Sequence, residues 1–419
     1  MRSSCPSLIR TQVLEDPHEN IKLFYILNFL RNLIPICPVY VLLFQSKGLS
    51  LGEISLLLAI WAVPAVVLEI PTGILADNWN RKHMLTLGFL LNAAGFMLWY
   101  FSEGFALFAL GFILWGISES FFSGTFEGLL FDTLKACGKE DEFDRIYGRA
   151  NFFAGISMAI SMFTGGFLSA TLGMGNALLL SVLSVMGGFL VSFFLKEVNY
   201  YHSKTGKKQG LRQGMKTLKE AALFLTGQHK ILLVALAGIL IVGIANIIDE
   251  YDPLIAESFR LDLTWIGIWE GCRLLLGALG SRIAWRVKGL AGRLRFGDIF
   301  GVIWTLSIVS AICMGIFGLR PSWLLLPLYG LFYLIMASAE ILVEDWLQQK
   351  IEEQGRATVH SLFSLAFGGY GILFCSVFAV VMPEFMASRV LMGVSAYMLL
   401  ACLAMGAAYR VYVRKGTRG

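Results

Sequence analysis

Charged residues are scarce in this sequence. Asp, Glu, Lys and Arg make up 15% of the 419 residues, whereas hydrophobic residues make up 57% and the mean hydropathy is +0.69. Soluble domains carry about a quarter charged residues, so this composition excludes a protein whose main solvent is water. Lipid cannot satisfy an open backbone N–H or C=O, and the apolar runs are too long and unbroken for barrel strands. The sequence therefore predicts an all-α membrane protein.

Clustered histidines and cysteines are also lacking. The five His and seven Cys are dispersed, and no Cys-x-x-Cys pair occurs. We therefore expect no metal, no haem and no other cofactor. A membrane hydrolase or transferase would need a His-Asp or Ser-His cluster, so we expect no enzyme. A membrane sensor, the other competing class, would need a soluble partner domain, and no loop is long enough for one.

Two functional signatures are missing as well. The ATP-binding pattern Gly-x-x-x-x-Gly-Lys-[Ser/Thr] does not occur, which excludes direct use of ATP. The first 20 residues are polar and carry neither the apolar core nor the cleavage site of a signal peptide. We therefore expect the first membrane span itself to direct insertion.

Twelve apolar windows are long enough to cross a bilayer. They lie near 22–44, 52–75, 84–102, 105–131, 148–171, 175–196, 230–250, 263–285, 296–318, 322–344, 356–382 and 387–409. A long basic stretch between the sixth and seventh windows divides the chain into two halves. The predicted parts are an N-terminal segment (1–21), a six-helix bundle (22–196), a basic linker (197–229), a second six-helix bundle (230–409) and a tail (410–419).

Positive charge gathers on one side of the predicted membrane. Of the 34 Lys and Arg residues, four lie in loops of one side and two lie inside spans, which leaves 28 on the side of both termini. The four are Lys47, Arg260, Arg320 and Arg389, and the two are Arg31 and Arg273. The positive-inside rule then places both termini in the cytoplasm, in a multi-pass protein of the cytoplasmic (inner) membrane. The basic linker lies beside anionic lipid in this arrangement, and we expect no nucleic-acid binding.

A short pattern occurs once in each half. It consists of Glu, then Asp five residues later at the end of a span, then Gly-Arg-Ala where the next span opens. Its charged residues are Glu127, Asp132 and Arg149 in the first half, and Glu340, Asp345 and Arg356 in the second. Chance is the alternative for so short a pattern, but its corresponding placement favours duplication of a six-helix unit.

The loop after the second span carries a longer motif, Gly73-Ile-Leu-Ala-Asp77-Asn-Trp-Asn-Arg81-Lys82. It resembles the loop between helices two and three of the major facilitator superfamily, written G-x-L-a-D-r-x-G-r-k. Asn80 stands where the family has Gly, and Asn is the next-best residue for a left-handed turn. Asp77 is placed to cap the start of the third span, while Arg81 and Lys82 hold the loop inside. The resemblance also implies that Asp77 bridges to the other half at the cytoplasmic gate.

This resemblance implies two pseudo-symmetric bundles of six helices that carry a small molecule by alternating access. The expected partners are the lipid bilayer, a small-molecule substrate and protons, the last because carboxylates lie within the predicted spans, and we expect a monomer. Ser120 and Ser161-Met162 replace residues that the drug:proton antiporters of the superfamily carry in spans four and five. Proton-coupled export of an amphipathic compound is the first expectation, and proton-coupled uptake of a polar metabolite is the alternative.

Charged residues within spans are the default candidates for a transport pathway, because lipid disfavours them. Arg31 lies about 13 Å and Glu119 about 21 Å into their spans from opposite faces, so both come near mid-membrane. We therefore predict that Arg31 and Glu119 pair on the wall of the first half. A purely structural pair that locks two helices is an equal alternative.

A second group of polar residues lies at the end of the predicted seventh span. Asn246, Asp249 and Glu250 crowd its outer end, followed by Asp252 and Pro253. Clustered carboxylates at an unwound helix end suit a cation site, a proton site or an extracellular gate, and a solvated loop is the alternative. Glu270 and Arg273, three residues apart on the eighth span, predict a structural pair within one helix.

The duplicated pattern suggests a gate. Glu127 with Arg149, and Glu340 with Arg356, are expected to form cytoplasmic ion pairs that hold the inner side shut.

Pro35 and Pro38 interrupt the first span just beyond Arg31, and we expect either a gating bend or a passive kink there.

Overall fold

Every regular element that the structure describes is a helix. The computed structural model describes residues 18–198, 227–293, 298–322, 324–350, 356–381 and 386–416, with single positions between 216 and 223. The elements of the first half are α1 (His18–Asn32), η1 (Cys37–Val39), α2 (Tyr40–Ser46), α3 (Leu51–Asn78), α4 (Arg81–Phe101), α5 (Phe105–Phe122), α6 (Thr125–Ala136), η2 (Glu140–Glu142), α7 (Phe143–Leu172) and α8 (Met174–Ser192). Those of the second half are α11 (His229–Leu240), η3 (Val242–Ile244), α12 (Ala245–Ile248), η4 (Asp249–Tyr251), α13 (Asp252–Ser258), α14 (Leu263–Arg293), α15 (Ile299–Leu319), α16 (Leu326–Lys350), α17 (Arg356–Val381) and α18 (Ala387–Gly416).

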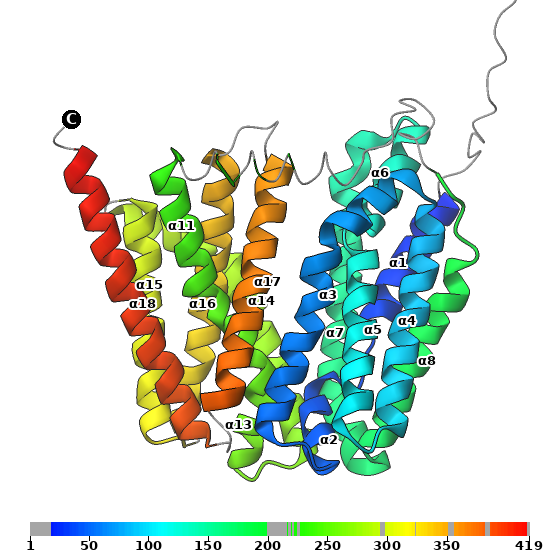
Figure 1. The fold of residues 1–419 in the computed structure, drawn as a ribbon, viewed down its shortest axis with the longest axis horizontal. Coiled ribbons are helices and arrows are strands. Elements are labelled where there is room, and N and C mark those ends of the chain that lie inside the picture. The colour runs from blue at the N-terminus through cyan, green and yellow to red at the C-terminus, as the bar shows by residue number, and fades with distance from the viewer. Residues whose placement is uncertain are drawn as a thin grey trace, which may run out of the picture.

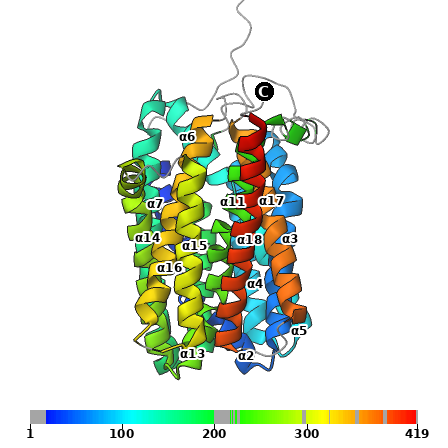
Figure 2. The ribbon, with the colours of Figure 1, turned by 90° about the vertical axis from the view of Figure 1, so that its left-hand side faces the viewer.

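The helices form two bundles that stand side by side (Figures 1 and 2). Helices α1 to α8 build the first bundle, and α11 to α18 build the second. The bundles meet along two pairs of helices, α3 with α17 and α7 with α14. The two-bundle fold predicted from the sequence is therefore confirmed.

The helices are long and apolar enough to cross a membrane. Eleven segments of the described residues meet this criterion by length and hydropathy. The remaining predicted span corresponds to α14, which has 31 residues and so reaches about 46 Å. Its hydropathy is lower because Glu270 and Arg273 lie within it. Large apolar side chains such as Leu183 and Leu190 are exposed on the outer surface, where lipid replaces water.

The start of α1 and the end of α18 lie at the same end of the molecule (Figure 1). We call this end the termini side, and the opposite end, where α2 and α13 lie, the far side. An even number of crossings explains why both chain ends reach one side.

Polar residues fix where the helices begin. The Ser50 hydroxyl accepts a hydrogen bond from the Glu53 N–H, and the Glu53 carboxylate accepts one from the Ser50 N–H over 2.8 Å, so a capping box starts α3. Asn80 is the N-cap of α4, since its side chain accepts from the His83 N–H over 3.1 Å. The N-cap position that the sequence analysis gave to Asp77 is thus held by Asn80, and since the Asp77 side chain lies outside the described residues, its own role stays a prediction. The backbone of Asn80 is also not in the left-handed region, because an N-cap residue takes the extended conformation seen here, with φ −77 and ψ 114.

The core of the first bundle is aromatic. Trp99 is fully buried, and its ring centroid lies 4.9 Å from that of Phe44 and 4.6 Å from that of Phe112. These three side chains come from α4, α2 and α5, so they tie the short far-side helix α2 to the body of the bundle.

Candidate functional site

The first span is broken at mid-depth, as the two prolines predict. Helix α1 ends at Asn32, and the chain resumes as η1 and α2. The freed backbone N–H groups find hydroxyl partners on neighbouring helices: Ile34 donates to Ser161 over 2.8 Å, and Ile36 donates to Ser181 over 3.0 Å. Such side-chain partners make an interrupted helix tolerable inside a membrane.

The seventh span is broken in the same way, and here the sequence prediction was wrong. The span runs from His229 to Ser258 and does not stop near residue 250. Pro253 occupies the first turn of α13, where a missing N–H is harmless, so it starts a new helix instead of ending the span. Asp249, Glu250 and Asp252 therefore lie inside the membrane-spanning segment rather than at its outer end.

Arg273 is the centre of a buried charge cluster. Its guanidinium contacts the carboxylates of Asp249 at 3.1 Å, Asp252 at 3.3 Å and Glu270 at 2.9 Å. The Arg273 side chain is 14% exposed, while those of Asp252 and Glu270 are 0% and 2% exposed. The predicted pair between Glu270 and Arg273 is present, but it belongs to a larger network that joins α14 to the broken seventh span. We call Arg273 and these acidic residues, with the adjacent Glu250, the Arg273 cluster.

Two tyrosines of α16 complete the cluster. The hydroxyls of Tyr329 and Tyr333 both donate to Asp252 Oδ1, the latter over 2.9 Å. The Arg273 guanidinium also lies 5.2 Å from the centre of the Tyr333 ring. These residues were not predicted from the sequence, and the one signal that could have indicated them is their spacing of four, which places both hydroxyls on one helix face.

Among the described residues, the Arg273 cluster holds more carboxyl groups than guanidinium groups. Three carboxylates contact one guanidinium, Glu250 is adjacent to them in the chain, and Asp249 Oδ1 and Glu270 Oε1 are buried without a hydrogen-bond partner. An uncompensated carboxylate inside a membrane protein costs several kcal/mol. The arrangement is therefore suited to binding protons or another cation.

Hydrogen bonds from the cluster region reach the other bundle. The Tyr40 hydroxyl, at the start of α2, donates to Glu250. One residue further on, the buried Tyr251 hydroxyl donates to the Ser55 hydroxyl of α3 over 2.9 Å. The broken first and seventh spans thus meet where the acidic residues lie.

Glycines bring the bundles into backbone contact on the far side. A Cβ atom at Gly166 of α7 would lie 2.2 Å from the Leu263 carbonyl oxygen and 2.8 Å from the Gly267 Cα of α14. A Cβ atom at Gly52 of α3 would lie 2.9 Å from the Ala379 carbonyl oxygen of α17. Toward the termini side the ribbons of the two bundles separate (Figure 1). The structure is therefore the state that is closed on the far side.

The structure brings Arg31 and Glu119 together. Their side chains form an ion pair and are 26% and 27% exposed. The Arg31 guanidinium also lies 4.5 Å from the ring centre of Phe122, one helical turn beyond Glu119. This pair joins the end of α1 to α5 on the first bundle.

The expected ion pair between Glu127 and Arg149 is not formed. Glu127 accepts a hydrogen bond from the Tyr147 hydroxyl over 3.0 Å, and the described residues give Arg149 no ion pair with it. Glu340 accepts from the Asn246 amide over 3.0 Å, and the Arg356 side chain lies outside the described residues. Both pairs were assigned to a closed inner gate, whereas the close glycine contacts between the bundles lie toward the far side, and the pair of Glu340 with Arg356 stays a prediction.

The aspartates of the duplicated pattern have equivalent partners in the two halves. Arg81 contacts Asp132 at 2.7 Å, with both side chains buried, and Lys288 contacts Asp345 at 2.6 Å. In each half, a basic residue after the second span binds the aspartate at the end of the fourth. This equivalence supports duplication over chance.

The loop motif is anchored within its own bundle. Besides its bond to Asp132, Arg81 donates from its backbone N–H to Glu197, and the Lys82 ammonium donates to the Phe193 carbonyl oxygen over 2.6 Å. Gly73 is exposed within α3, with open space where a Cβ would lie. The Asp77 side chain lies outside the described residues.

Comparison with known proteins gives one family, one relative and two solved structures. The family model described as "Major Facilitator Superfamily" matches residues 23–373. The Bacillus subtilis (strain 168) protein described as "Uncharacterized MFS-type transporter YxaM" is 22% identical over 240 residues, and the match spans 57% of this chain and 59% of that protein's length. A crystal structure of a mutant of nucleoside transporter NupG matches with a TM-score of 0.76 at 14% identity, covering 93% of this chain and 99% of that one. A second NupG structure has a TM-score of 0.70 at the same identity, covering 94% of this chain and 98% of that one. At such identity the likeness shows the fold alone.

Proposed function

Since this chain belongs to the Major Facilitator Superfamily, we propose that it carries a small molecule across the membrane by alternating access, driven by protons that bind at the Arg273 cluster. The superfamily consists of transporters, so the chain is no enzyme. The observation that carries the proton proposal is the excess of buried carboxyl groups over the single guanidinium.

The position of Glu250 supports coupling between proton binding and conformation. Glu250 accepts the hydrogen bond of Tyr40, so an ionisable group lies at a contact between the bundles. Neutral carboxyl groups are the least costly to bury, and Asp252 and Glu270 are almost fully buried in the far-closed state. Protonation of the cluster therefore favours this state, and loss of protons favours opening of the far side.

We propose that the substrate binds between polar groups of the two bundles. Arg31 with Glu119 on the first bundle, and Asn246 with Glu340 on the second, are accessible although they lie within spans. Phe122 beside Arg31 adds an apolar surface, which supports export of an amphipathic compound. The amide and carboxylate of the second pair suit a polar metabolite, and NupG is described as a nucleoside transporter, so proton-coupled uptake of such a metabolite is the second candidate.

The charge distribution supports the orientation. We propose that the chain is a monomer in the cytoplasmic (inner) membrane with both termini in the cytoplasm, since 28 of its 34 Lys and Arg residues lie on that side. The proposed parts remain the bundles 22–196 and 230–409, joined by the basic linker 197–229. This linker falls mostly outside the described residues.

Coupling is tested without knowing the substrate. Spin labels at Gln45 of α2 and Ser258 of α13, both exposed, report the far-side distance as the pH is lowered. We expect acidification to enlarge the short-distance population of the wild-type protein. The variant Glu250→Gln should keep that population at every pH, because its amide imitates the neutral acid. Glu257→Gln, at an exposed carboxylate of the same α13, is the matched control. A Glu250→Gln variant with the pH response of the wild type would refute coupling through this residue.

The substrate site has a separate test. Melting temperatures of the purified protein are measured with amphipathic dyes, nucleosides, sugars and amino acids, since a bound ligand raises them. A compound that stabilises the wild type should lose its effect on Arg31→Ala and on Glu119→Gln. Normal stabilisation and transport in both variants would reduce this pair to a structural role.

A further inference from the structure

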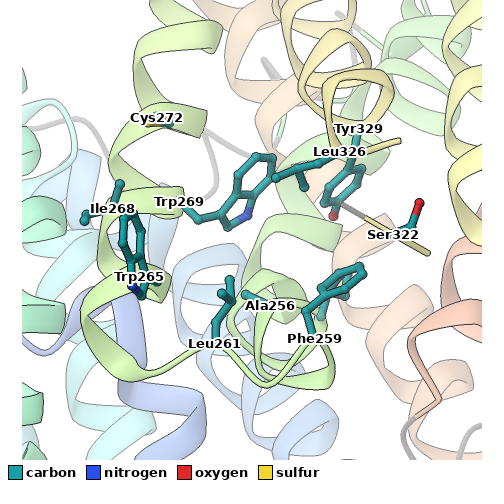
Figure 3. A pocket seen from close by; sticks show the side chains of 11 residues that line it. Ala256, Phe259, Leu261, Trp265, Ile268, Trp269, Cys272, Ser322, Leu326 and Tyr329 are labelled. Carbon is teal, nitrogen blue, oxygen red and sulfur yellow. The ribbon is translucent and has the colours of Figure 1, made fainter. Parts of the chain in front are cut away.

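An apolar pocket lies in the second bundle near the far side, between α13, α14 and α16 (Figure 3). Its volume is about 200 Å³, larger than the cavity of about 150 Å³ that holds benzene in a well-studied protein. The lining includes Ala256, Phe259, Trp265, Trp269, Cys272 and Tyr329. A cavity so lined takes an apolar ligand and has room for several methylene groups.

The mouth of the pocket belongs to the lipid-facing side of α14. Trp265 and Cys272 are exposed, and Leu275 and Leu279 continue the same exposed face along the helix. The opposite face, with Gly267 and its neighbours, packs against α7. Because α14 crosses the membrane, the molecules that meet its exposed face are the acyl chains of the bilayer.

Two cationic residues adjoin the pocket at the level of the headgroups. Arg260 lies between the lining residues Phe259 and Leu261, and Arg320 lies two residues before the lining residue Ser322. Both arginines are exposed, and neither forms an ion pair within the part of the chain that the structure describes. They are two of the four cationic residues in the far-side loops. Guanidinium groups bind phosphate oxygens through paired, charge-assisted hydrogen bonds.

We propose that this pocket binds one acyl chain of a phospholipid whose phosphate lies against Arg260 and Arg320. The bound chain packs against Trp269 and Tyr329, whose rings stack with centroids 5.7 Å apart and an angle of 14°. The Tyr329 hydroxyl donates to Asp252 of the Arg273 cluster. The bound lipid therefore supports the Tyr329 side chain, which helps to hold the Arg273 cluster together.

Photo-crosslinking tests the acyl chain. The full-length protein is placed in vesicles of phosphatidylcholine that contain a phosphatidylcholine with a diazirine on one acyl chain, and labelled peptides are identified by mass spectrometry. We expect strong labelling of the segment 256–272. Ala256→Trp fills the buried end of the pocket and Cys272→Trp blocks its mouth, so labelling should fall to the level of the general lipid-facing surface. Leu279→Trp, on the same face of α14 but beyond the pocket, should label as the wild type does.

The folding of each variant is checked by its melting temperature, and Cys272→Trp keeps the test valid if Ala256→Trp does not fold, because Cys272 is exposed. Labelling spread evenly over all lipid-facing helices, or unchanged by the tryptophan variants, would overturn the pocket as a lipid site.

The headgroup has its own test. Arg260→Gln combined with Arg320→Gln should reduce labelling by the phospholipid, whereas Arg389→Gln, in another far-side loop, should not. Unchanged labelling in the double variant would overturn the assignment of a phospholipid.

Discussion

The contact between Gly166 and Gly267 offers a direct test of the state described here. A methyl group at Gly166 would lie 2.2 Å from the carbonyl oxygen of Leu263, far inside any real Cβ contact. Backbone of α14 cannot rotate away as a side chain can. Gly166→Ala must therefore push the far-side ends of α7 and α14 apart.

The size of the effect follows from the geometry. Ordinary contact needs about 3.4 Å or more, so the helices must separate by roughly 1 Å at this point. Extra methyl groups in a tightly packed interface cost about 1–3 kcal/mol. This cost falls on the far-closed state alone, because the two glycines are apart once the far side opens. A bias of that size changes the ratio of the two states by about 5- to 150-fold.

The assay is the spin-label distance between Gln45 and Ser258, measured at one pH. Gly166→Ala should lengthen it or populate a second, longer distance. Gly155→Ala on the same α7, and Gly277→Ala on α14, are matched controls, because a Cβ at either site meets nothing within 4 Å. Both controls also carry the gain in helix propensity that comes with alanine, so this gain cancels. A Gly166→Ala distance distribution identical to that of the controls would refute the close far-side contact.

Three further predictions follow from other contacts. Gly128→Ala places a methyl group 2.8 Å from the Arg81 guanidinium carbon and should break the buried ion pair of Arg81. We expect a lower melting temperature and a loss of about 3 kcal/mol in the free energy of unfolding. Gly148→Ala, at an open site, should cause no such loss. Tyr251→Phe removes a hydrogen bond between the bundles and should reduce the far-closed population by about 1 kcal/mol, read from the same spin labels. Burial raises the pKa of Asp298, but hydrogen bonds from a lysine and a tyrosine outweigh it and hold the pKa below its ordinary value. The stability that this carboxylate contributes at neutral pH is therefore lost as the pH falls through its folded-state pKa, and a melting series of Asp298→Asn should lack that loss.

The sequence by itself determined the class of protein and the number of spans. Apolar length, the one-sided distribution of Lys and Arg, and the duplicated pattern each depend on position along the chain, which a sequence displays directly. The depth of Arg31 and Glu119 followed from helical rise alone, and that sufficed to predict their pair.

Only the tertiary structure decided which charges gather into one site. Tyr40, Asp252, Arg273 and Tyr329 come from four different spans, and helix periodicity fixes the face of each residue but not which helix that face meets. The seventh span was placed too short because Pro253 reads equally well as the end of one helix or the start of another. The pair of Glu127 with Arg149 is absent for a related reason. A sequence does not specify which of two conformations is populated, and this pair was expected in a closed inner side, whereas the bundles here are in contact on the far side.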